Sequence, residues 1–276
     1  MDSSKNLGSE SNFPMRSKIY FTSDAHLGSR HHADPMTVER RLAAWLERIR
    51  YEAKAIYFMG DMFDYWFEYR YVVPRGFTRF LGKVAELSDE GVEIHFFAGN
   101  HDVWLTDYLT KELGAHVHMH GITVELSGKL FRLAHGDEEY RSVKRSYDCM
   151  YRLFRNPLAR LLYAAVHPRW TVGLAYGISL KSRRSGEKRK TLGNIPHAYS
   201  NDYFDIENEW LIRFTKEHSA RHPEVDFYIF GHRHLLVDMA LRDEKRVLIL
   251  GDWIRYNSYA VWDGTTLVLE SMEDME

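Results

Sequence analysis

Short apolar runs, each ending in a polar motif, recur along this chain and restrict its fold more than any other feature. The runs are rich in β-branched and aromatic residues, which favours strands with at least one buried face. They occupy residues 18–21, 55–59, 92–97, 129–134 and 226–230. Helical patterns with apolar residues on one face separate the first three runs, over residues 38–49 and 77–87. This alternation predicts β-α-β units, whose functional groups collect beyond the carboxyl ends of the strands.

The polar motif after each run contains side chains that bind metal ions. In chain order the motifs are Asp24-Ala25-His26, Gly60-Asp61, Gly99-Asn100-His101-Asp102, His135-Gly136-Asp137 and Gly231-His232-Arg233-His234. Carboxylate, imidazole and amide oxygen together suit manganese, iron, zinc or magnesium, and these motifs contain no thiolate to select a softer ion. Because functional groups gather at the carboxyl ends of such strands, we expect the motifs to converge. They predict a phosphoesterase site for two divalent ions, with manganese as the first choice.

The motifs resemble those of the calcineurin-like metallophosphoesterase superfamily. Nearly all of the chain after its first sixteen residues resembles the bacterial UDP-2,3-diacylglucosamine pyrophosphohydrolases of lipid A synthesis. The continuation Asp64-Tyr65-Trp66 is more typical of these hydrolases than the metal ligands are, whereas protein phosphatases of the superfamily carry Asp-Arg-Gly there. The resemblance also implies two ligand sets. Asp24, His26 and His234 would hold one metal, Asn100, His135 and His232 the second, and Asp61 would bridge the two.

Two metals about 3.5–4 Å apart bind a hydroxide at neutral pH, so hydrolysis of a phosphate ester or anhydride needs no nucleophilic side chain. His101 is the candidate for a catalytic group that does not bind metal, acting as an acid toward the departing oxygen or as a cation. Asp102 would fix its tautomer and keep it charged. The alternative is that His101 is a structural turn residue. We expect Asp64 and Asp137 to orient ligand histidines or loop amides.

Two departures from the resembled hydrolases affect the substrate. The best-known members have Arg where this chain has His101. A phosphate leaving group departs with little need of a proton, whereas an alkoxide benefits from an acid, so His101 keeps simple phosphodiesters and phosphomonoesters open as substrates. The chain also lacks the Cys-Thr pair that follows the fourth motif in that family, and has Glu138, Glu139 and Tyr140 instead. Substrate contacts near that point do not carry over residue by residue.

A strongly basic segment follows the fourth motif. Residues 141–190 contain 13 Lys or Arg against Asp148 and Glu187, a balance of +11 in a chain of net charge −2. Residues 151–166 predict an amphipathic helix interrupted at Pro157. In the resembled family a helical cap lies here, covers the metals and receives acyl chains, and Arg155-Asn156-Pro157 matches a short motif of that cap. We therefore expect a cap over residues 140–200, suited to an anionic amphiphile.

Several residues are candidates for contact with the substrate, and the Lys and Arg residues among them alternatively form a solvated face, as runs of like charge often do. These candidates are Asn100, Lys181, Arg183, Arg184 and Lys188. Nucleic-acid binding is not expected, because the sequence pI is about 6.7 and no recognition motif accompanies the basic segment.

Length and composition favour one domain over residues 17–276 with the cap as an insertion, preceded by a polar tail over residues 1–16 that we expect to be disordered. The single Cys149 excludes an intrachain disulfide and suits a reducing cytoplasm. The uncharged stretch over residues 170–180 is shorter than the ~20 residues that span a bilayer. Any contact with the cytoplasmic face of the inner membrane would be peripheral, and the sequence leaves the oligomeric state open.

Two further patterns lie outside the motifs. His116, His118 and His120 share one face of a possible strand, where a second metal site is conceivable but an open strand face rarely closes a coordination shell. Near the C-terminus, residues 246–250, 259–262 and 266–270 predict strands, with a turn at Asp263-Gly264. We expect these strands to complete the second sheet.

These features predict an α/β sandwich of two sheets flanked by helices, with an inserted helical cap. The expected reaction is hydrolysis of the diphosphate of UDP-2,3-diacylglucosamine to UMP and 2,3-diacylglucosamine 1-phosphate. One alternative is a metallophosphoesterase that acts on another nucleotide, phosphodiester or phospholipid headgroup. A second is a non-catalytic metal-binding scaffold, which the presence of every expected ligand disfavours.

Overall fold

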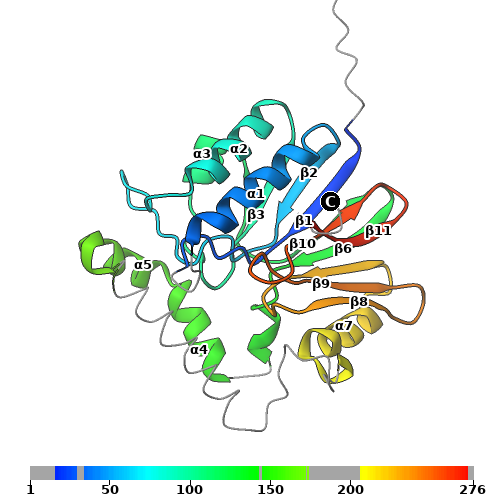
Figure 1. Cartoon of the computed structure of the whole chain (residues 1–276). Helices are drawn as coiled ribbons and strands as arrows, with labels where there is room; N and C mark the ends of the chain where they lie inside the picture. Colours follow the sequence, from blue (N-terminus) through cyan, green and yellow to red (C-terminus); the bar gives the residue numbers. More distant parts are fainter. Residues whose placement is uncertain (1–15, 30–33, 143–144, 172, 174–205, 273–276) are drawn as a thin grey trace, which may run out of the picture.

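Two β-sheets face each other, and helices cover the outer face of each sheet, as the computed structural model shows (Figure 1). The structure describes residues 16–29, 34–142, 145–171, 173 and 206–272. This arrangement confirms the predicted α/β sandwich. Residues 1–15 of the N-terminal tail and the basic candidates Lys181, Arg183, Arg184 and Lys188 lie outside the described residues.

The first sheet has six strands in the order β11-β10-β1-β2-β3-β4. They are β1 (Lys18–Thr22), β2 (Ala53–Phe58), β3 (Glu93–Phe97), β4 (His116–His118), β10 (Ser258–Trp262) and β11 (Leu267–Ser271). Strands β1 to β4 pair in parallel, and β10 pairs antiparallel to both β1 and β11. The parallel strands therefore place the first three motifs side by side at the carboxyl ends of β1, β2 and β3.

The second sheet has five strands in the order β5-β6-β7-β9-β8. They are β5 (Ile122–Leu126), β6 (Lys129–Ala134), β7 (Phe227–Phe230), β8 (Leu236–Ala240) and β9 (Arg246–Leu250). Strands β6, β7 and β9 are parallel, while β5 and β8 pair antiparallel at the two edges. The last two motifs follow β6 and β7, so both sheets supply the site.

One prediction about the strands was wrong. Only β9 completes the second sheet, because β10 and β11 form a hairpin that extends the first sheet beside β1. Every residue of β10 is buried. Tyr259 and Val261 pack in the core beneath α1, while Ala260 and Trp262 pack in the core between the sheets. Apolar side chains on both faces suit a central strand of either sheet, which is why the pattern alone did not identify the partner.

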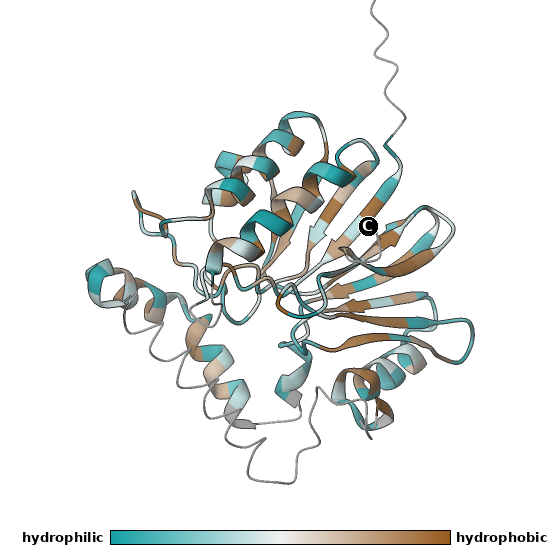
Figure 2. Ribbon diagram, in the orientation of Figure 1, coloured by the Kyte–Doolittle hydropathy of each residue, from teal (hydrophilic) through white to brown (hydrophobic). Residues whose placement is uncertain are grey.

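Helices α1 (Pro35–Ile49), α2 (Thr78–Asp89) and α3 (Tyr108–Leu113) connect the parallel strands of the first sheet and lie on its outer face (Figure 1). The predicted apolar faces of α1 and α2 are buried, with Leu42 and Phe80 fully enclosed. Helix α7 (Trp210–Arg221) covers the second sheet. Figure 2 shows polar residues on the outward surfaces of these helices and apolar residues along the strands.

A second group of helices lies beside the ends of the strands (Figure 1). It comprises η1 (Glu139–Ser142), α4 (Arg145–Phe154) and α5 (Pro157–Ala164), whereas η2 (Ile206–Asn208) leads into α7 and packs against the second sheet. The predicted interruption at Pro157 is confirmed, because α4 ends at Phe154 and Asn156 caps α5 by accepting from the amides of Leu158 and Ala159 at 2.8 and 3.2 Å. None of the described helices is both long and apolar enough to span a membrane.

Candidate metal centre

The motifs converge where the carboxyl ends of β1, β2, β3, β6 and β7 meet. Three groups of ligand-type side chains occur among the described residues, with ligand atoms within 4.8 Å of one another in each group. The groups are Asp24, His26 and His234; His26, Asp61 and His101; and Asp61, His135 and His232. The groups share members and therefore form one continuous centre. None of the groups found among the described residues includes a residue of β4, where His118 Nε2 lies 3.0 Å from His95 Nδ1.

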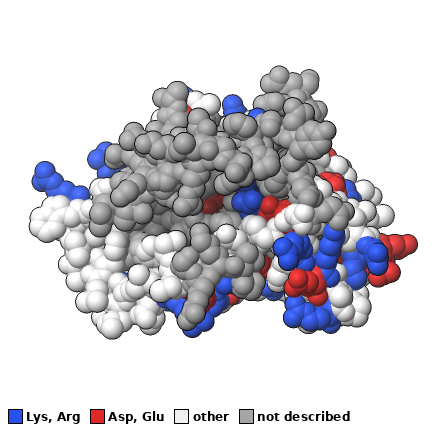
Figure 3. Space-filling view, turned by 90° about the horizontal axis from the view of Figure 1, so that it is seen from below, with Lys and Arg blue, Asp and Glu red and all other residues white. Residues whose placement is uncertain are grey.

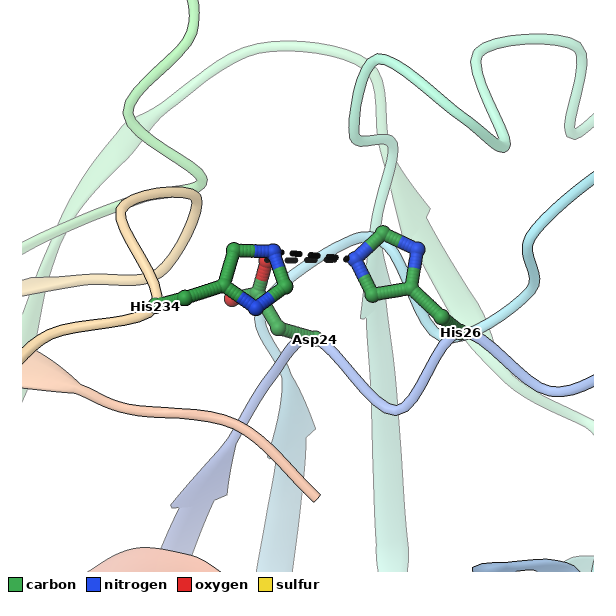
Figure 4. Close-up of side chains that lie close together, drawn as sticks. All are labelled: Asp24, His26 and His234. Atoms are coloured by element: carbon green, nitrogen blue, oxygen red, sulfur yellow. Dashed lines mark hydrogen bonds and ion pairs between the residues drawn. The ribbon is translucent and has the colours of Figure 1, made fainter. Parts of the chain in front are cut away.

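The first group presents its donors to a common point, as Figure 4 shows. The Nε2 atoms of His26 and His234 lie 3.1 Å apart, and Asp24 Oδ1 lies 3.4 Å from His234 Nε2 and 3.8 Å from His26 Nε2. Ligands bound at about 2.1 Å from one ion are separated by about 3–3.5 Å. These spacings suit one divalent cation.

Asp61 lies between the first group and the second. Its Oδ2 atom is 3.8 Å from His26 Nε2 and 3.5 Å from His135 Nε2, so one oxygen faces a histidine of each group. Asn100 Oδ1 lies 3.4 Å from His135 Nε2, and the rings of His135 and His232 are 5.1 Å apart. The bridging role that the resemblance implied for Asp61 stays a prediction, for which this is the position required.

Backbone amides hold the two aspartates with one oxygen turned toward the centre. Asp24 Oδ2 accepts from the amide of His232 at 2.8 Å, and Asp61 Oδ1 accepts from the amide of His101 at 2.8 Å. Asp24 Oδ1 is buried and accepts no hydrogen bond from a described residue. A buried carboxylate oxygen without a donor is costly, and a bound cation removes that cost. Both the distances between the donor atoms and the unpaired Oδ1 atom of Asp24 therefore suit a bound metal ion.

Left-handed backbone is concentrated in the candidate ligands. The φ angles are 54° at Asp24, 43° at His26, 53° at Asp61, 66° at His232 and 51° at His234. Each such non-glycine residue costs about 1–3 kcal/mol, and this strain characteristically persists where function requires it. Close approach also requires Gly99, since a Cβ there would overlap the Asp61 carboxylate.

In three of the candidate histidine ligands, the ring nitrogen that faces away from the centre lies against an oxygen atom of the protein. His26 Nδ1 lies 3.5 Å from Asp64 Oδ1, His135 Nδ1 lies 2.9 Å from the carbonyl oxygen of Met59, and His234 Nδ1 lies 2.8 Å from Asp252 Oδ2. Such partners fix the tautomer and turn Nε2 toward a metal.

The predicted orienting role of Asp64 is consistent with this geometry, whereas the sequence interpretation missed Asp252. A signal for it existed, because Gly251-Asp252 follows β9 as Gly60-Asp61 follows β2. Because Gly251-Asp252 is a Gly-Asp pair directly after a strand, the sequence interpretation should have counted it among the motifs.

Asp102 has a different environment from the one expected. Its carboxylate accepts from the amides of Gly99, Met62, Asp61 and Phe63 at 2.7, 2.9, 3.2 and 3.3 Å, instead of holding the ring of His101. The prediction that Asp102 fixes the His101 tautomer is corrected, because the amides of two loops turn inward and need a buried acceptor. Burial, together with the charge of Asp61, raises the pKa of Asp102 to about 6.

The carbonyl oxygen of Asp64 lies 3.1 Å from His101 Nδ1 and takes the place expected for Asp102. A proton on Nδ1 would be donated to this carbonyl, which leaves Nε2 free. The rings of His101 and His26 are nearly perpendicular, with centroids 4.7 Å apart. His101 is therefore at the centre, close enough to serve as a ligand as well as a catalytic group.

The electrostatics favour the metal-binding form at His26, His232 and Asp61 but oppose it at the other charged donors: burial raises the pKa of Asp24, and Asp24 raises the pKa of His234 against the effect of burial. Burial lowers the pKa of His26 to about 3, and burial with the neighbouring His135 holds the pKa of His232 well below its usual range. Burial opposes ionisation of Asp61, but His135 and His101 outweigh it and hold the Asp61 pKa well below its usual range. For His135, burial favours the neutral ring, yet Asp61 raises its pKa well above the ordinary value. A cation would displace that proton.

Comparison with known proteins extends this picture. The sequence profile of the family described as "Calcineurin-like phosphoesterase" matches residues 17–236. A protein of Porphyromonas gingivalis named "UDP-2,3-diacylglucosamine hydrolase" is 99% identical over 262 residues, covering 95% of this chain and 100% of the relative. A protein of the same name from Edwardsiella ictaluri is 28% identical, covering 86% of this chain and 85% of the relative.

Among solved structures, a dimetal phosphatase from Danio rerio aligns with a TM-score of 0.43 and 13% identity, covering 92% of this chain and 95% of that chain. The family match and the clustered donors indicate that the chain uses divalent metal.

Proposed function

The chain belongs to the calcineurin-like phosphoesterase family, and from this premise we propose that it hydrolyses the diphosphate of UDP-2,3-diacylglucosamine to UMP and 2,3-diacylglucosamine 1-phosphate. The two relatives named for this substrate support the proposal, and one of them is 99% identical over 262 residues. The convergence of both donor groups on the Oδ2 atom of Asp61 is the observation that carries the chemistry.

Two divalent ions, with manganese as the first choice, complete the proposed site. Asp24, His26 and His234 would hold one ion, Asn100, His135 and His232 the other, and Asp61 both. When bound, the ions supply a hydroxide at neutral pH and neutralise phosphoryl oxygens. The unpartnered Asp24 Oδ1 atom supports the first ion, and the shared Asp61 oxygen supports the pair.

His101 is the proposed catalytic side chain beyond the metal ligands. With Nδ1 against the carbonyl of Asp64, its Nε2 atom is available to donate a proton to a departing oxygen or to carry positive charge near the phosphoryl group. Asp102 supports it indirectly by fixing the loop amides on either side of the centre. Replacing His101 with Ala would lower the rate and leave metal content unchanged. Loss of metal would instead make His101 a ligand.

The test of the proposed function is manganese-supplemented hydrolysis of UDP-2,3-diacylglucosamine beside bis(p-nitrophenyl) phosphate. Asp61→Ala should abolish turnover of both substrates and lower metal content, because it removes the oxygen that both donor groups face. Asp89→Ala is the matched control, since this carboxylate is exposed at the end of α2. UMP release that survives in Asp61→Ala above a few per cent of the unaltered rate would contradict the assignment.

A second candidate function is hydrolysis of a simpler phosphodiester or phosphomonoester, which the acid-capable His101 favours. Turnover of the small diester without release of UMP from the lipid substrate would select it. The non-catalytic scaffold would show metal binding and no turnover of either compound.

We also propose that α4 and α5 belong to a cap over residues 140–200 that touches the cytoplasmic face of the inner membrane peripherally. No residue of α5 is buried, and Leu158, Leu161 and Leu162 are more than 60% exposed. Lys and Arg side chains stand beside Asp and Glu in the described part of the face in Figure 3. Leu161→Asp should reduce co-sedimentation with anionic phospholipid vesicles, whereas unchanged co-sedimentation would remove α5 from the contact.

A further inference from the structure

The loop after β2 passes the metal centre and then contacts α5 and the segment that follows α5. Its contacts come from alternate positions, Tyr65, Phe67 and Tyr69. The hydroxyl oxygens of Tyr65 and Tyr163 lie 3.1 Å apart, and the ring of Phe67 packs on Tyr163 with centroids 4.8 Å apart. The hydroxyl oxygen of Tyr69 lies 2.5 Å from Thr171 Oγ1. One loop next to the metal centre therefore holds α5 through three neighbouring contacts.

The hydroxyl groups in these contacts form a chain with a defined direction. Tyr163 donates to the carbonyl oxygen of Thr171 at 3.1 Å, so its own oxygen is left to accept from Tyr65. The hydroxyl of Thr171 donates to the carbonyl oxygen of Pro168 at 3.3 Å, so it can accept from Tyr69. Burial raises the pKa of Tyr65 and keeps its proton in place. The two tyrosines of the loop are therefore the donors, and the cap supplies the acceptors.

Apolar burial contributes little to the position of α5. None of its residues is buried, and Figure 1 shows α5 apart from both sheets. The ring of Tyr163 lies 4.8 Å from Phe67 and 4.7 Å from Trp104, measured between centroids. Trp104 also donates its indole N–H to the carbonyl oxygen of Phe154, at the end of α4, at 2.7 Å. Because α5 buries so little apolar surface, the hydrogen bonds of Tyr163 carry a large share of its docking.

The docked cap bounds a cavity of about 70 Å³ beside the metal centre. Asn100 lines this cavity from the loop after β3, and Met150 and Phe154 line it from α4. Its width is therefore set by where the cap docks. The loop that holds α5 also reaches the centre, because the carbonyl oxygen of Asp64 lies 3.1 Å from His101 Nδ1. A single loop thus contacts both the cap and the centre.

We propose that Tyr65 and Tyr163 are positioning residues that set the spacing between the cap and the metal centre, and thereby select substrates large enough to touch both. The proposal deepens the proposed function and rests on it, because UDP-2,3-diacylglucosamine is such a substrate. A substrate held at two points binds more tightly when the spacing between those points is fixed beforehand, since less freedom is lost on binding. A small diester that binds at the centre alone gains nothing from that spacing.

The test compares Tyr163→Phe, Tyr65→Phe and the double variant, which remove hydroxyl groups and keep the rings. Tyr71→Phe is the matched control, because Tyr71 lies on the same loop and is 85% exposed. A neutral hydrogen bond contributes about 2-fold to 10-fold to an equilibrium constant, so Tyr163→Phe, which loses two, should raise KM for UDP-2,3-diacylglucosamine about 5-fold or more. Its kcat, its metal content and its hydrolysis of bis(p-nitrophenyl) phosphate should match those of the unaltered protein. Adding Tyr65→Phe to Tyr163→Phe should change KM little, because both substitutions remove the same bond.

An unchanged KM in Tyr163→Phe would overturn the inference, and so would additive effects of the two substitutions. Equal losses on both substrates would show that the tyrosines only stabilise the fold.

An inhibition measurement keeps the inference separate from the identity of the substrate. Dodecyl phosphate, whose alkyl chain extends beyond the centre, should inhibit the small-diester reaction more strongly than methyl phosphate at constant free manganese. Tyr163→Phe should reduce that advantage about 5-fold or more. If the unaltered protein releases no UMP, the proposed function fails, while an undiminished advantage of dodecyl phosphate in Tyr163→Phe would overturn the inference about the tyrosines.

Discussion

Asp252 provides a test of how the protein orients its candidate metal ligands. Its Oδ2 atom lies 2.8 Å from His234 Nδ1, and its Oδ1 atom accepts from the amides of Ile254 and Arg255 at 3.0 and 2.7 Å. The carboxylate keeps a proton on Nδ1, so that Nε2, 3.1 Å from His26 Nε2, presents a lone pair. Asp252→Asn keeps the shape and the bonds to the amides, but its NH₂ group can turn toward Nδ1 and move the ring proton to Nε2.

Loss of such an outer partner lowers metal affinity about 10–100-fold, which corresponds to about 1.4–2.7 kcal/mol. The assay is activity against free manganese concentration. The concentration for half-maximal rate should rise by that factor, while kcat at saturating manganese should recover. Asp238→Asn is the control, because Asp238 pairs with Arg246 at the surface on β8. If Asp252→Asn binds manganese as tightly as the unaltered protein, the orientation of His234 does not depend on Asp252 and the reasoning is refuted.

Two further predictions concern the space around glycines and stability in acid. Gly99→Ala should abolish metal-dependent turnover, because its Cβ would overlap the Asp61 carboxylate. Gly82→Ala meets open space within α2 and should raise the free energy of unfolding by about 0.5–1 kcal/mol. Equal activities and equal urea midpoints in the two variants would contradict both expectations. Burial lowers the pKa of His95 to about 4 against the opposing Glu93, so its unfolded state binds a proton first as the pH falls. The contribution of His95 to stability is therefore complete above about pH 6.5 and lost toward pH 4. His95→Gln should take up about one proton fewer on unfolding near pH 5, and an unchanged dependence of the urea midpoint on pH would contradict this.

The sequence predicted the centre better than it predicted the surrounding fold, and the reason is physical. A metal ligand must have a particular chemistry and must follow a strand in this arrangement, so Asp24, Asp61 and His135 are visible in the sequence alone. The partner of a buried strand is not visible in this way. The composition of β10 suits a strand of either sheet, and only the antiparallel pairing of β10 with β1 shows to which sheet it belongs.

The partners of charged side chains were also beyond the sequence. Asp102 adjoins His101 along the chain, which made a pairing natural to expect, but the loops turn their amides toward it in space. The contact between Asp137 and Arg155 joins residues 18 positions apart and depends on where α4 ends. The type of each side chain can be read from the sequence, whereas the partner that it contacts depends on how elements distant in the sequence pack together.

The four amide bonds to Asp102 have a consequence for the choice of ion. This one carboxylate fastens the loop that carries Asp61 to the loop that carries Asn100, although it belongs to neither proposed ligand set. Bonds from amides to a charged acceptor contribute about 1.5–3 kcal/mol each, so the two loops are cross-braced and shift together. The separation between the two proposed metal positions would then be set by the polypeptide. With a smaller divalent ion, the bond lengths around each ion would change, and the two donor sets would keep their separation.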